Sequence, residues 1–358
     1  MTGAAAEETA RLRQMISGYM VSQVIYVTAV LGLADLTATS AIGADALARE
    51  TGTDGPSLAR LLRALVALGL AEESEPERFR MTALGALLRA DIPGSLRNVA
   101  LMHGGESGWR AWGSLLHSVR TGENAFEHVF GTGSFQHLAR EPERAALFTA
   151  YMADATRPFV AAILAAHDFS RYRRIIDIGG GNGVFMSRVL AALPNAEGII
   201  FDTPSGIEGG QMELDAAGVG ERCRRVAGDF FRDAPEAADA YILKSVLHDW
   251  DDNRAAAILK TCRRAMRRDS TLLVVERLLP ERIECSEAHR EIAMMDMHML
   301  AVPGGRERTA SEYAELLAAA ELCSIDVRPT ASPFAVVIAV RADMQTDQQD
   351  DEKKGARS

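Results

Sequence analysis

The chain has 358 residues, a formal net charge of −10 and an apolar share of 47%, so it is long enough for two domains that each bury a core. Because an acidic chain repels phosphate backbones, we expect small-molecule partners and no nucleic acid. The four cysteines include no CxxC pair, which favours reduced thiols over a disulfide framework or a zinc site.

The two ends of the chain and its apolar runs predict where the protein resides. The start, "MTGAAAEETARLRQ", is charged where a signal peptide needs apolar residues. No apolar run approaches the roughly 18 to 20 residues of a membrane helix, so we expect a cytoplasmic protein with no membrane partner. Residues 343–358 are almost entirely polar or charged, which predicts a disordered tail.

Residues 8–166 have apolar side chains at helical spacing and few β-branched runs, which predicts a mostly α-helical domain. Within it, residues 44–88 predict a helix, a turn, a second helix and a short hairpin, the order of a winged helix. We favour a dimerisation module over a DNA reader, because acids occupy the hairpin where DNA needs basic residues. The apolar segment "YMVSQVIYVTAVLGLADL" is either a buried helix or a face shared with a partner.

Residues 167–342 follow a different pattern, in which short apolar strands alternate with amphipathic helices. The strands include "RIIDI", "GIIFD", "CRRVAGD", "AYILKSVL" and "TLLVVE". This alternation predicts a parallel sheet with helices on both faces. Ligands of such sheets bind at the carboxyl ends of the strands, so the residues that follow each strand are the candidate site residues.

The turn "DIGGGNG" follows the first of these strands and has glycines at GxGxG spacing. A dinucleotide fingerprint needs GxGxxG, and Val184 and Met186 occupy the positions where its last glycine would fall. Asp202 ends the next strand at the offset where a carboxylate binds a ribose diol. Asp229 and Phe230 follow the third strand, where an acid and a ring suit a base. Together they predict a nucleoside ligand without a pyrophosphate.

With these motifs the chain resembles class I S-adenosylmethionine-dependent O-methyltransferases of small molecules, typified by plant caffeate and bacterial anthracycline enzymes. The resemblance rests on "DIGGGNG", "FD", "GDFF", "LKSVLHDWDD", "VVERLLP" and "PGGRERT" in that order. It implies a winged-helix-like dimerisation domain followed by a Rossmann-like catalytic domain of α/β class, a homodimer, and S-adenosylmethionine as cofactor with S-adenosylhomocysteine as product. The cofactor contacts that it implies are Gly179, Gly181, Asp202, Thr203, Gly228, Asp229, Phe230, Lys244 and Ser245.

His248 is the candidate general base, because it follows a strand beside the expected cofactor. A phenol with a pKa of about 10 is ionised in only about one molecule in a thousand at pH 7, and a positioned imidazole offsets a deficit of that size. The resemblance adds Glu276 and Glu307 as acids that flank the histidine. For Glu307 the alternative is a surface charge run in "GRER". Asp249 either orients the ring or caps the helix that begins near Asp252.

The acceptor pocket is predicted from "EIAMMDMHMLAVPGG", since methionine adapts to flat ligands. His298 stands where we expect an apolar residue, and it either binds a second polar group of the acceptor or is a hydrogen-bonded core residue. The segment also lacks a residue that plant members carry before "PGG", which argues against a phenylpropanoid acceptor. The predicted pocket residues are Met152, Asp249, Met295, His298 and Met299.

We therefore expect an enzyme that methylates a hydroxyl of an aromatic small molecule in bacterial secondary metabolism. No carboxylate and histidine cluster resembles a magnesium site, so we expect no metal. One alternative is a nitrogen or carbon methyltransferase of the same fold. The alternative from another class is a metabolite-sensing regulator that uses its winged helix on DNA, which the acidic pI and the acidic hairpin disfavour.

Overall fold

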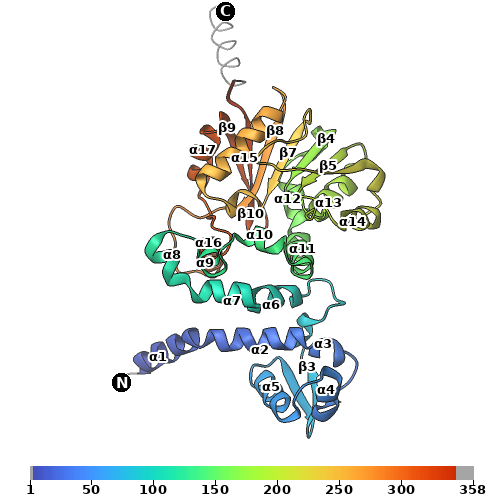
Figure 1. Cartoon of the computed structure of the whole chain (residues 1–358), viewed down its shortest axis with the longest axis vertical. Helices are drawn as coiled ribbons and strands as arrows, with labels where there is room; N and C mark the ends of the chain where they lie inside the picture. Colours follow the sequence, from blue (N-terminus) through green and yellow to red (C-terminus); the bar gives the residue numbers. More distant parts are fainter. Residues whose placement is uncertain (1–2, 344–358) are drawn as a thin grey trace, which may run out of the picture. The chain divides into compact units, whose positions relative to one another are not determined.

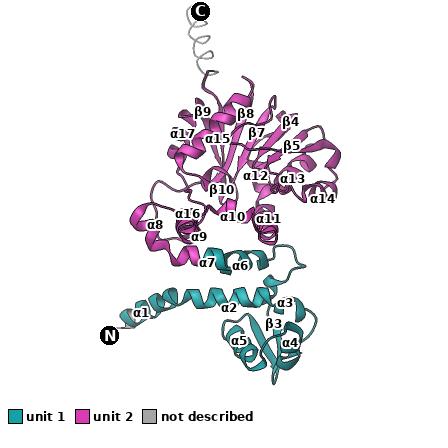
Figure 2. Cartoon of the chain, viewed as in Figure 1, with its two compact units in different colours: residues 1–109 teal, residues 110–358 magenta. Residues whose placement is uncertain are grey.

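The computed structural model describes residues 3–343, and the chain divides into two compact units (Figure 1). Unit 1 is residues 1–109 and unit 2 is residues 110–358 (Figure 2). The sequence placed the division at 166/167, whereas the structure groups residues 110–166 with the α/β half. The physical reason is packing: Val160 and Ile163 of this segment are buried in one core with residues of the central sheet. All but the first residue of the predicted tail 343–358 lies outside the described residues.

Unit 1 is a helical unit with a small antiparallel sheet in the order β1-β3-β2. Its core consists of leucines of the short helices together with Phe79. The helices are α1 (Gly3–Ile16), α2 (Gly18–Val30), α3 (Leu33–Leu36), α4 (Ala44–Thr51), α5 (Gly55–Ala67) and α6 (Arg97–Gly104). The strands are β1 (Ile42–Gly43), β2 (Ala71–Glu75) and β3 (Arg78–Met81).

The winged helix predicted for residues 44–88 is present as α4, α5, β2 and β3. Helix α5 begins where Asp54 accepts from the backbone N–H of Ser57, with a proline in its first turn, which is a strong start signal. On the β2–β3 hairpin, Arg80 pairs with Glu72 and Arg78 with Glu75. These arginines are therefore engaged by the acids of the same hairpin.

Within residues 110–343, seven strands form one sheet in the order β6-β5-β4-β7-β8-β10-β9. The strands are β4 (Arg174–Ile178), β5 (Glu197–Asp202), β6 (Cys223–Ala227), β7 (Ala240–Lys244), β8 (Thr271–Arg277), β9 (Leu322–Pro329) and β10 (Phe334–Arg341). Helix α7 (Glu106–Gly113) contains the division between the units. The helices that follow it are α8 (Leu115–Thr121), α9 (Ala125–Phe130), α10 (Ser134–Leu138), α11 (Pro142–Thr156), α12 (Val160–Ala166), α13 (Val184–Ala192), α14 (Gly210–Ala216), α15 (Asp252–Ala265), α16 (Glu287–Ala301) and α17 (Ala310–Ala318).

The strands β4, β5, β7, β8 and β10 are buried on both faces, which explains why they are almost continuously apolar. In β7, Tyr241 and Leu243 join the core that contains α15 and α17, while Ala240 and Ile242 join the core that contains α12, α13 and α14. This alternation follows from the period of two in a strand. The apolar side chains of the sheet interior are therefore used in packing, and, apart from Asp177 within β4, the polar candidate site residues lie at the strand ends.

The prediction of a parallel sheet is correct for β6, β5, β4, β7 and β8 and wrong for the other edge. Strand β10 pairs antiparallel with β8, and β9 pairs antiparallel with β10. A short turn joins β9 to β10, and a hairpin of this kind requires an antiparallel pair. The parallel strands still place their carboxyl ends at one edge of the sheet.

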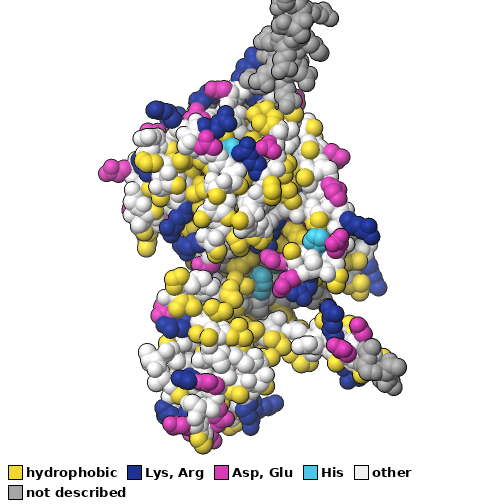
Figure 3. Space-filling view, turned by 180° about the vertical axis from the view of Figure 1, so that it is seen from behind, with side chains coloured by type: hydrophobic (Ala, Val, Ile, Leu, Met, Phe, Trp, Pro, Cys, Tyr) yellow, Lys and Arg dark blue, Asp and Glu magenta, His cyan; other side chains and the backbone are white. Residues whose placement is uncertain are grey.

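No helix within residues 3–343 combines the length and the apolar character needed to cross a membrane. On the face of the molecule seen in Figure 3, acidic and basic side chains are interspersed over the α/β unit, with hydrophobic side chains between them. On that face, the acidic side chains therefore do not form one patch.

Candidate active site

The predicted cofactor residues lie at the carboxyl edge of the parallel strands. Gly179 follows β4, Asp202 ends β5, Gly228 follows β6 and Lys244 ends β7. The loops are joined directly: Gly179 donates its N–H to Phe201 O at 2.8 Å, and Gly228 donates to Asp202 O at 2.9 Å. Register and hydrogen bonding thus bring together residues that are up to 65 positions apart in the chain.

The glycine turn has a backbone that other residues would strain. Gly179 has φ +72° and Gly183 φ +82°, both in the left-handed region. A Cβ on Gly179 would clash with the Val246 side chain, and one on Gly183 would collide with Ile200. These glycines let the turn pass close to neighbouring strand ends, as a ligand-binding loop must.

Asp202 connects this turn to the next strand end. Its Oδ2 accepts from the N–H of Gly181 at 2.9 Å, and its Oδ1 accepts from the N–H of Thr203 at 2.6 Å. Burial raises the pKa of Asp202, although these backbone donors and the Thr203 hydroxyl oppose the shift. The carboxylate is thus held by the loop with lone pairs remaining for ligand hydroxyls.

Lys244 is a buried amine at the end of β7. Its Nζ donates to Thr156 Oγ1 at 3.1 Å and to Ser245 Oγ at 3.2 Å, and it lies over the ring of Phe334. Burial lowers the pKa of Lys244 to about 8, against the attraction of Glu276 and Asp177. Thr156 was not predicted as a site residue, and its helical context holds no signal for it.

Asp177 was also missed by sequence reasoning. It lies in β4, one residue before the end of the strand, with its carboxyl fully buried, and its Oδ2 has no hydrogen-bond partner within the described residues. Burial raises the pKa of Asp177 to about 7, although Lys244 attracts the charged form. An acid within the apolar run "RIIDI" was the available signal, because an unpaired buried charge is costly.

Asp229 and Phe230 follow β6 as expected. Asp229 Oδ1 accepts from the N–H of Phe231 at 3.0 Å, and its side chain is half exposed. The ring of Phe230 packs against Phe231 and Trp250. An aromatic wall therefore flanks the edge of the glycine turn, next to an accessible carboxylate.

His248 lies on a short 3-10 turn, Leu247–Asp249, that follows β7. Ser245 before it has φ +53°, an unusual value for a residue with a Cβ, and this turns the chain sharply at the strand end. Glu276 at the end of β8 is fully buried, and its Oε1 accepts from the N–H groups of Val246 and Leu247, each at 2.9 Å. Glu276 therefore holds the backbone of the histidine turn.

The ring of His248 is surrounded by carboxylates. Its Nδ1 lies 2.9 Å from Glu307 Oε1 and 3.8 Å from Glu276 Oε2. Its Nε2 lies 3.7 Å from Asp249 Oδ1, beyond a good hydrogen bond. Since Glu307 accepts from Nδ1–H, the neutral ring has its free lone pair on Nε2.

Two open alternatives from the sequence are decided by these positions. Glu307 is fully buried, so it is not part of a surface charge run. Helix α15 is capped by Asp251, whose Oδ1 accepts from the N–H of Arg254 at 2.9 Å, so Asp249 is not the cap. Asp249 is instead half-buried beside the His248 ring.

The carboxylates determine the protonation of this cluster. Burial opposes charge on the ring, but Glu276, Asp249 and Glu307 outweigh it and raise the pKa of His248 to about 10. Burial raises the pKa of Asp249 to about 7 and also raises that of Glu276, although the His248 charge opposes both shifts. The imidazolium is thus strongly favoured, so the neutral ring is a strong base.

The predicted acceptor residues are all at least partly buried. On α16, Met299 is buried and Met295 is half-buried, whereas Met294 is exposed. His298 Nδ1 accepts from the indole N–H of Trp112 at 3.1 Å. This bond favours the interpretation of His298 as a hydrogen-bonded core residue. Met152 is half-buried on α11, and its contact with an acceptor stays a prediction.

Sequence reasoning also missed how "PGGRERT" is fitted to the histidine turn. A Cβ on Gly305 would collide with the backbone of His248 and Asp249. The N–H of Arg306 donates to His248 O at 2.8 Å. The glycine is therefore required by close backbone contact, and it brings Glu307 to the ring.

Within residues 3–343, no group of three or more His, Cys, Asp or Glu side chains is arranged to hold a metal ion.

This fold and strand-edge site define the class of S-adenosylmethionine-dependent methyltransferases. A family model for the O-methyltransferase domain matches residues 112–322, and one for the O-methyltransferase dimerisation domain matches residues 13–91. The chain belongs to this O-methyltransferase family, in which solved members are bound to S-adenosylmethionine or S-adenosylhomocysteine.

Relatives and solved structures cover almost the whole chain. A phenazine O-methyltransferase of Lysobacter antibioticus is 45% identical over 92% of this chain and 95% of its own length. An O-demethylpuromycin O-methyltransferase of Streptomyces alboniger is 43% identical over 92% of this chain and 88% of its own. The structure of a mitomycin 7-O-methyltransferase has a TM-score of 0.89 at 34% identity, covering 96% of this chain and 100% of that one.

Proposed function

We propose that this enzyme transfers a methyl group to a hydroxyl of an aromatic secondary metabolite, with His248 as general base. The observation that carries the proposal is the buried cluster in which Glu307 and Glu276 flank the ring of His248. An imidazole with a high pKa suits removal of a proton from an unionised phenol, because the two pKa values are close. A relative named as a phenazine O-methyltransferase and one named as a 3-amino-4-hydroxybenzoate 4-O-methyltransferase support an aromatic acceptor.

Each residue has a separate task in this proposal. Nε2 of His248 takes the hydroxyl proton, while Glu307 holds the ring through Nδ1 and stabilises the imidazolium that forms. Glu276 holds the turn by two backbone hydrogen bonds. The two buried glutamates thereby orient the ring and favour its charged form.

The proposed cofactor residues fit a nucleoside sulfonium. Asp202 would accept from ribose hydroxyls, Asp229 and Phe230 would contact the base, and Lys244 and Ser245 lie at the next strand end. Gly179, Gly181, Thr203 and Gly228 form the backbone that surrounds them. When bound, S-adenosylmethionine supplies an electrophilic methyl group, and alignment alone contributes roughly 7–11 kcal/mol to such transfers.

The decisive experiment is mass spectrometry of the purified protein with S-adenosylmethionine and a panel of naphthols, hydroxyphenazines and the matching arylamines. A product that is one methyl heavier with the hydroxyl compounds supports the proposal. Methylation of the amines alone would instead support the nitrogen methyltransferase, which two relatives of 33% and 31% identity make a specific alternative. The DNA-binding regulator has weaker support, because Arg78 and Arg80 of the β2–β3 hairpin are paired with glutamates of the same hairpin.

The pH dependence of the reaction tests the His248 cluster. Because the pKa of His248 is raised to about 10, the neutral base is scarce at pH 7, and kcat/KM for an unionised phenol should rise from pH 7 towards pH 10. Glu307→Gln removes a carboxylate that raises this pKa, so the midpoint of the rise should move to lower pH. Stopped assays from pH 6 to 10 measure both midpoints. An unchanged midpoint would assign the rise to another group.

We also propose a homodimer formed through unit 1, in keeping with the dimerisation model matched there. Helices α1 and α2 expose a set of large hydrophobic side chains, which monomeric proteins rarely gather on one surface. These are Leu12, Met15, Ile16, Tyr19, Met20, Val21, Val27 and Val30. The cytoplasmic location remains a prediction from the sequence.

The dimer prediction is checked by charging this surface. Ile16→Glu combined with Met20→Glu should convert the dimer to a monomer in light scattering coupled to size exclusion, because burying two carboxylates in an apolar interface is costly. Leu116→Glu, at an exposed leucine of α8, is the matched control and should leave the mass unchanged. A wild-type protein that elutes as a monomer would contradict the dimer.

A further inference from the structure

Arg308 is a buried charged residue that the proposed reaction does not use. It directly follows Glu307, and its side chain is only 1% exposed. Its backbone is fixed beside the end of β8, because Arg308 O accepts from the N–H of Leu279 at 2.9 Å. Burying a guanidinium costs several kcal/mol unless its N–H groups find hydrogen-bond acceptors, so the acceptors around Arg308 must offset this cost.

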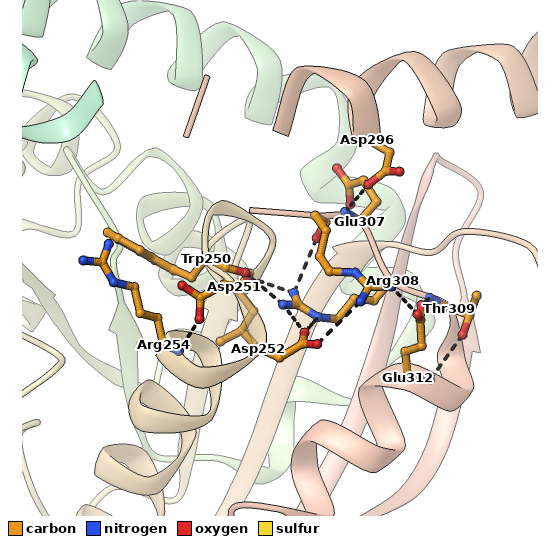
Figure 4. Close-up of polar contacts among 11 residues, drawn as sticks. Trp250, Asp251, Asp252, Arg254, Asp296, Glu307, Arg308, Thr309 and Glu312 are labelled. Carbon is orange, nitrogen blue, oxygen red and sulfur yellow. Dashed lines mark hydrogen bonds and ion pairs between the residues drawn. The ribbon is translucent and has the colours of Figure 1, made fainter. Parts of the chain in front are cut away.

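Figure 4 shows where the guanidinium of Arg308 reaches. One terminal nitrogen donates to Leu247 O at 3.0 Å and the other to Trp250 O at 2.8 Å. Nε and the second terminal nitrogen both donate to Asp252 Oδ1, at 2.9 and 2.8 Å. The ring of Tyr313 lies 5.9 Å from the guanidinium carbon. The terminal nitrogen that binds Leu247 O also donates to Arg306 O at 3.4 Å, so the planar guanidinium binds three carbonyls and one carboxylate.

The carbonyls of Leu247 and Trp250 lie on either side of the histidine turn. Leu247 precedes His248, and Trp250 follows Asp249, so Arg308 holds the backbone on both sides of the base. The neighbouring residues hold the same turn: Arg306 N–H donates to His248 O, and Glu307 contacts the ring. Three consecutive residues therefore contact one short turn: Arg306 binds the backbone of His248, Glu307 its ring, and Arg308 the carbonyls on either side.

We propose that Arg308 is a positioning residue that sets the orientation of His248, through the backbone of the turn and through the Glu307 beside it. The inference rests on the proposed function, in which His248 is the base. Within residues 3–343, the hydrogen bonds of the guanidinium go to backbone carbonyls and Asp252 and not to the His248 ring, so its effect passes through the turn. Small displacements of a reacting group reduce rates strongly, by about 100-fold for an error of about 1 Å.

A lysine does not replace this arrangement. Its single ammonium on a flexible stem cannot bind Leu247 O, Trp250 O and Asp252 at the same time, as the planar guanidinium does. Asp252 offers a milder way to weaken the arrangement, because its own side chain is 59% exposed. Asp252→Ala should leave the core intact while removing the charged partner of Arg308.

The experiment compares Arg308→Lys, Asp252→Ala and Asp251→Ala. Asp251→Ala is the matched control: it removes the cap of the same helix, at a cost of about 1 kcal/mol, without touching Arg308. Each variant is assayed on 1-naphthol and on 4-nitro-1-naphthol, whose hydroxyl is ionised at pH 8. Binding of S-adenosylhomocysteine and thermal stability are measured alongside.

We expect kcat for 1-naphthol to fall by about 10- to 100-fold in Arg308→Lys and by less in Asp252→Ala. The nitro compound, which needs no base, should lose much less, and cofactor binding should stay near that of the wild type. Asp251→Ala should lower stability without changing the ratio of the two rates. Equal losses on both acceptors would overturn the positioning role, since a structural defect does not discriminate between them.

The proposed function fails in a different way. If His248→Ala methylates 1-naphthol as fast as the wild type, the histidine is not the base, whatever the Arg308 variants do. If His248→Ala loses the reaction and Arg308→Lys keeps the wild-type ratio of rates, only the inference about Arg308 is wrong.

Discussion

His248→Ala is expected to lower kcat/KM for an unionised phenol by about 10²- to 10⁴-fold, the usual contribution of a positioned general base. The loss should shrink to less than about 10-fold for an acceptor whose hydroxyl is already ionised at the assay pH, because no proton then has to be removed. Initial rates on a series of ring-substituted phenols, plotted against acceptor pKa, measure this difference. A steeper dependence on acceptor pKa in the variant is the expected signature.

Two further variants protect this result from a folding artefact. The alanine leaves Glu276, Glu307 and Asp249 without the ring charge that they surround, so His248→Gln should be made as well, since its amide still donates to Glu307. His128→Ala, at an exposed histidine, controls for the loss of an imidazole. If both His248 variants bind S-adenosylhomocysteine normally and turn over unionised phenols at the wild-type rate, His248 has no role as a base.

Asp202→Ala is expected to weaken binding of S-adenosylhomocysteine by about 10²- to 10⁴-fold. The estimate follows from two hydrogen bonds to a carboxylate at about 1.5–3 kcal/mol each, where each 1.4 kcal/mol is a factor of ten. The carboxylate also accepts from Gly181 N–H, so its loss frees the glycine turn as well. Isothermal titration calorimetry measures the dissociation constant directly.

Asp202→Asn separates these two contributions. The amide oxygen can still accept from Gly181 or Thr203, whereas the charge that strengthens bonds to a ribose diol is gone. We therefore expect binding between that of the wild type and the alanine variant. Asp215→Asn, at an exposed acid on α14, is the control. Unchanged affinity in Asp202→Ala would remove this residue from the cofactor site.

The sequence was informative where spacing and chemistry are local. The change from helical spacing to alternating strands and helices predicted the α/β half, and the residues after each strand indicated the strand edge where we propose that the cofactor binds. The order of the winged helix was likewise present in residues 44–88. These features depend on neighbours in the chain, which is why periodicity and turn residues are sufficient to find them.

The tertiary structure decided what depends on contacts between distant segments. Periodicity was insufficient to tell that β10 pairs antiparallel with β8 and β9, or that residues 110–166 belong to the same compact unit as the sheet. It was also insufficient to tell that some apolar side chains of α2, such as Met20 and Val30, are exposed. The family resemblance indicated that Glu307 flanks His248, but its local pattern also allowed a surface charge. The close approach of Gly305 to the His248 turn brings Glu307 to the ring. Arg308 gave no signal at all, because the carbonyls that it binds lie about sixty residues earlier in the chain.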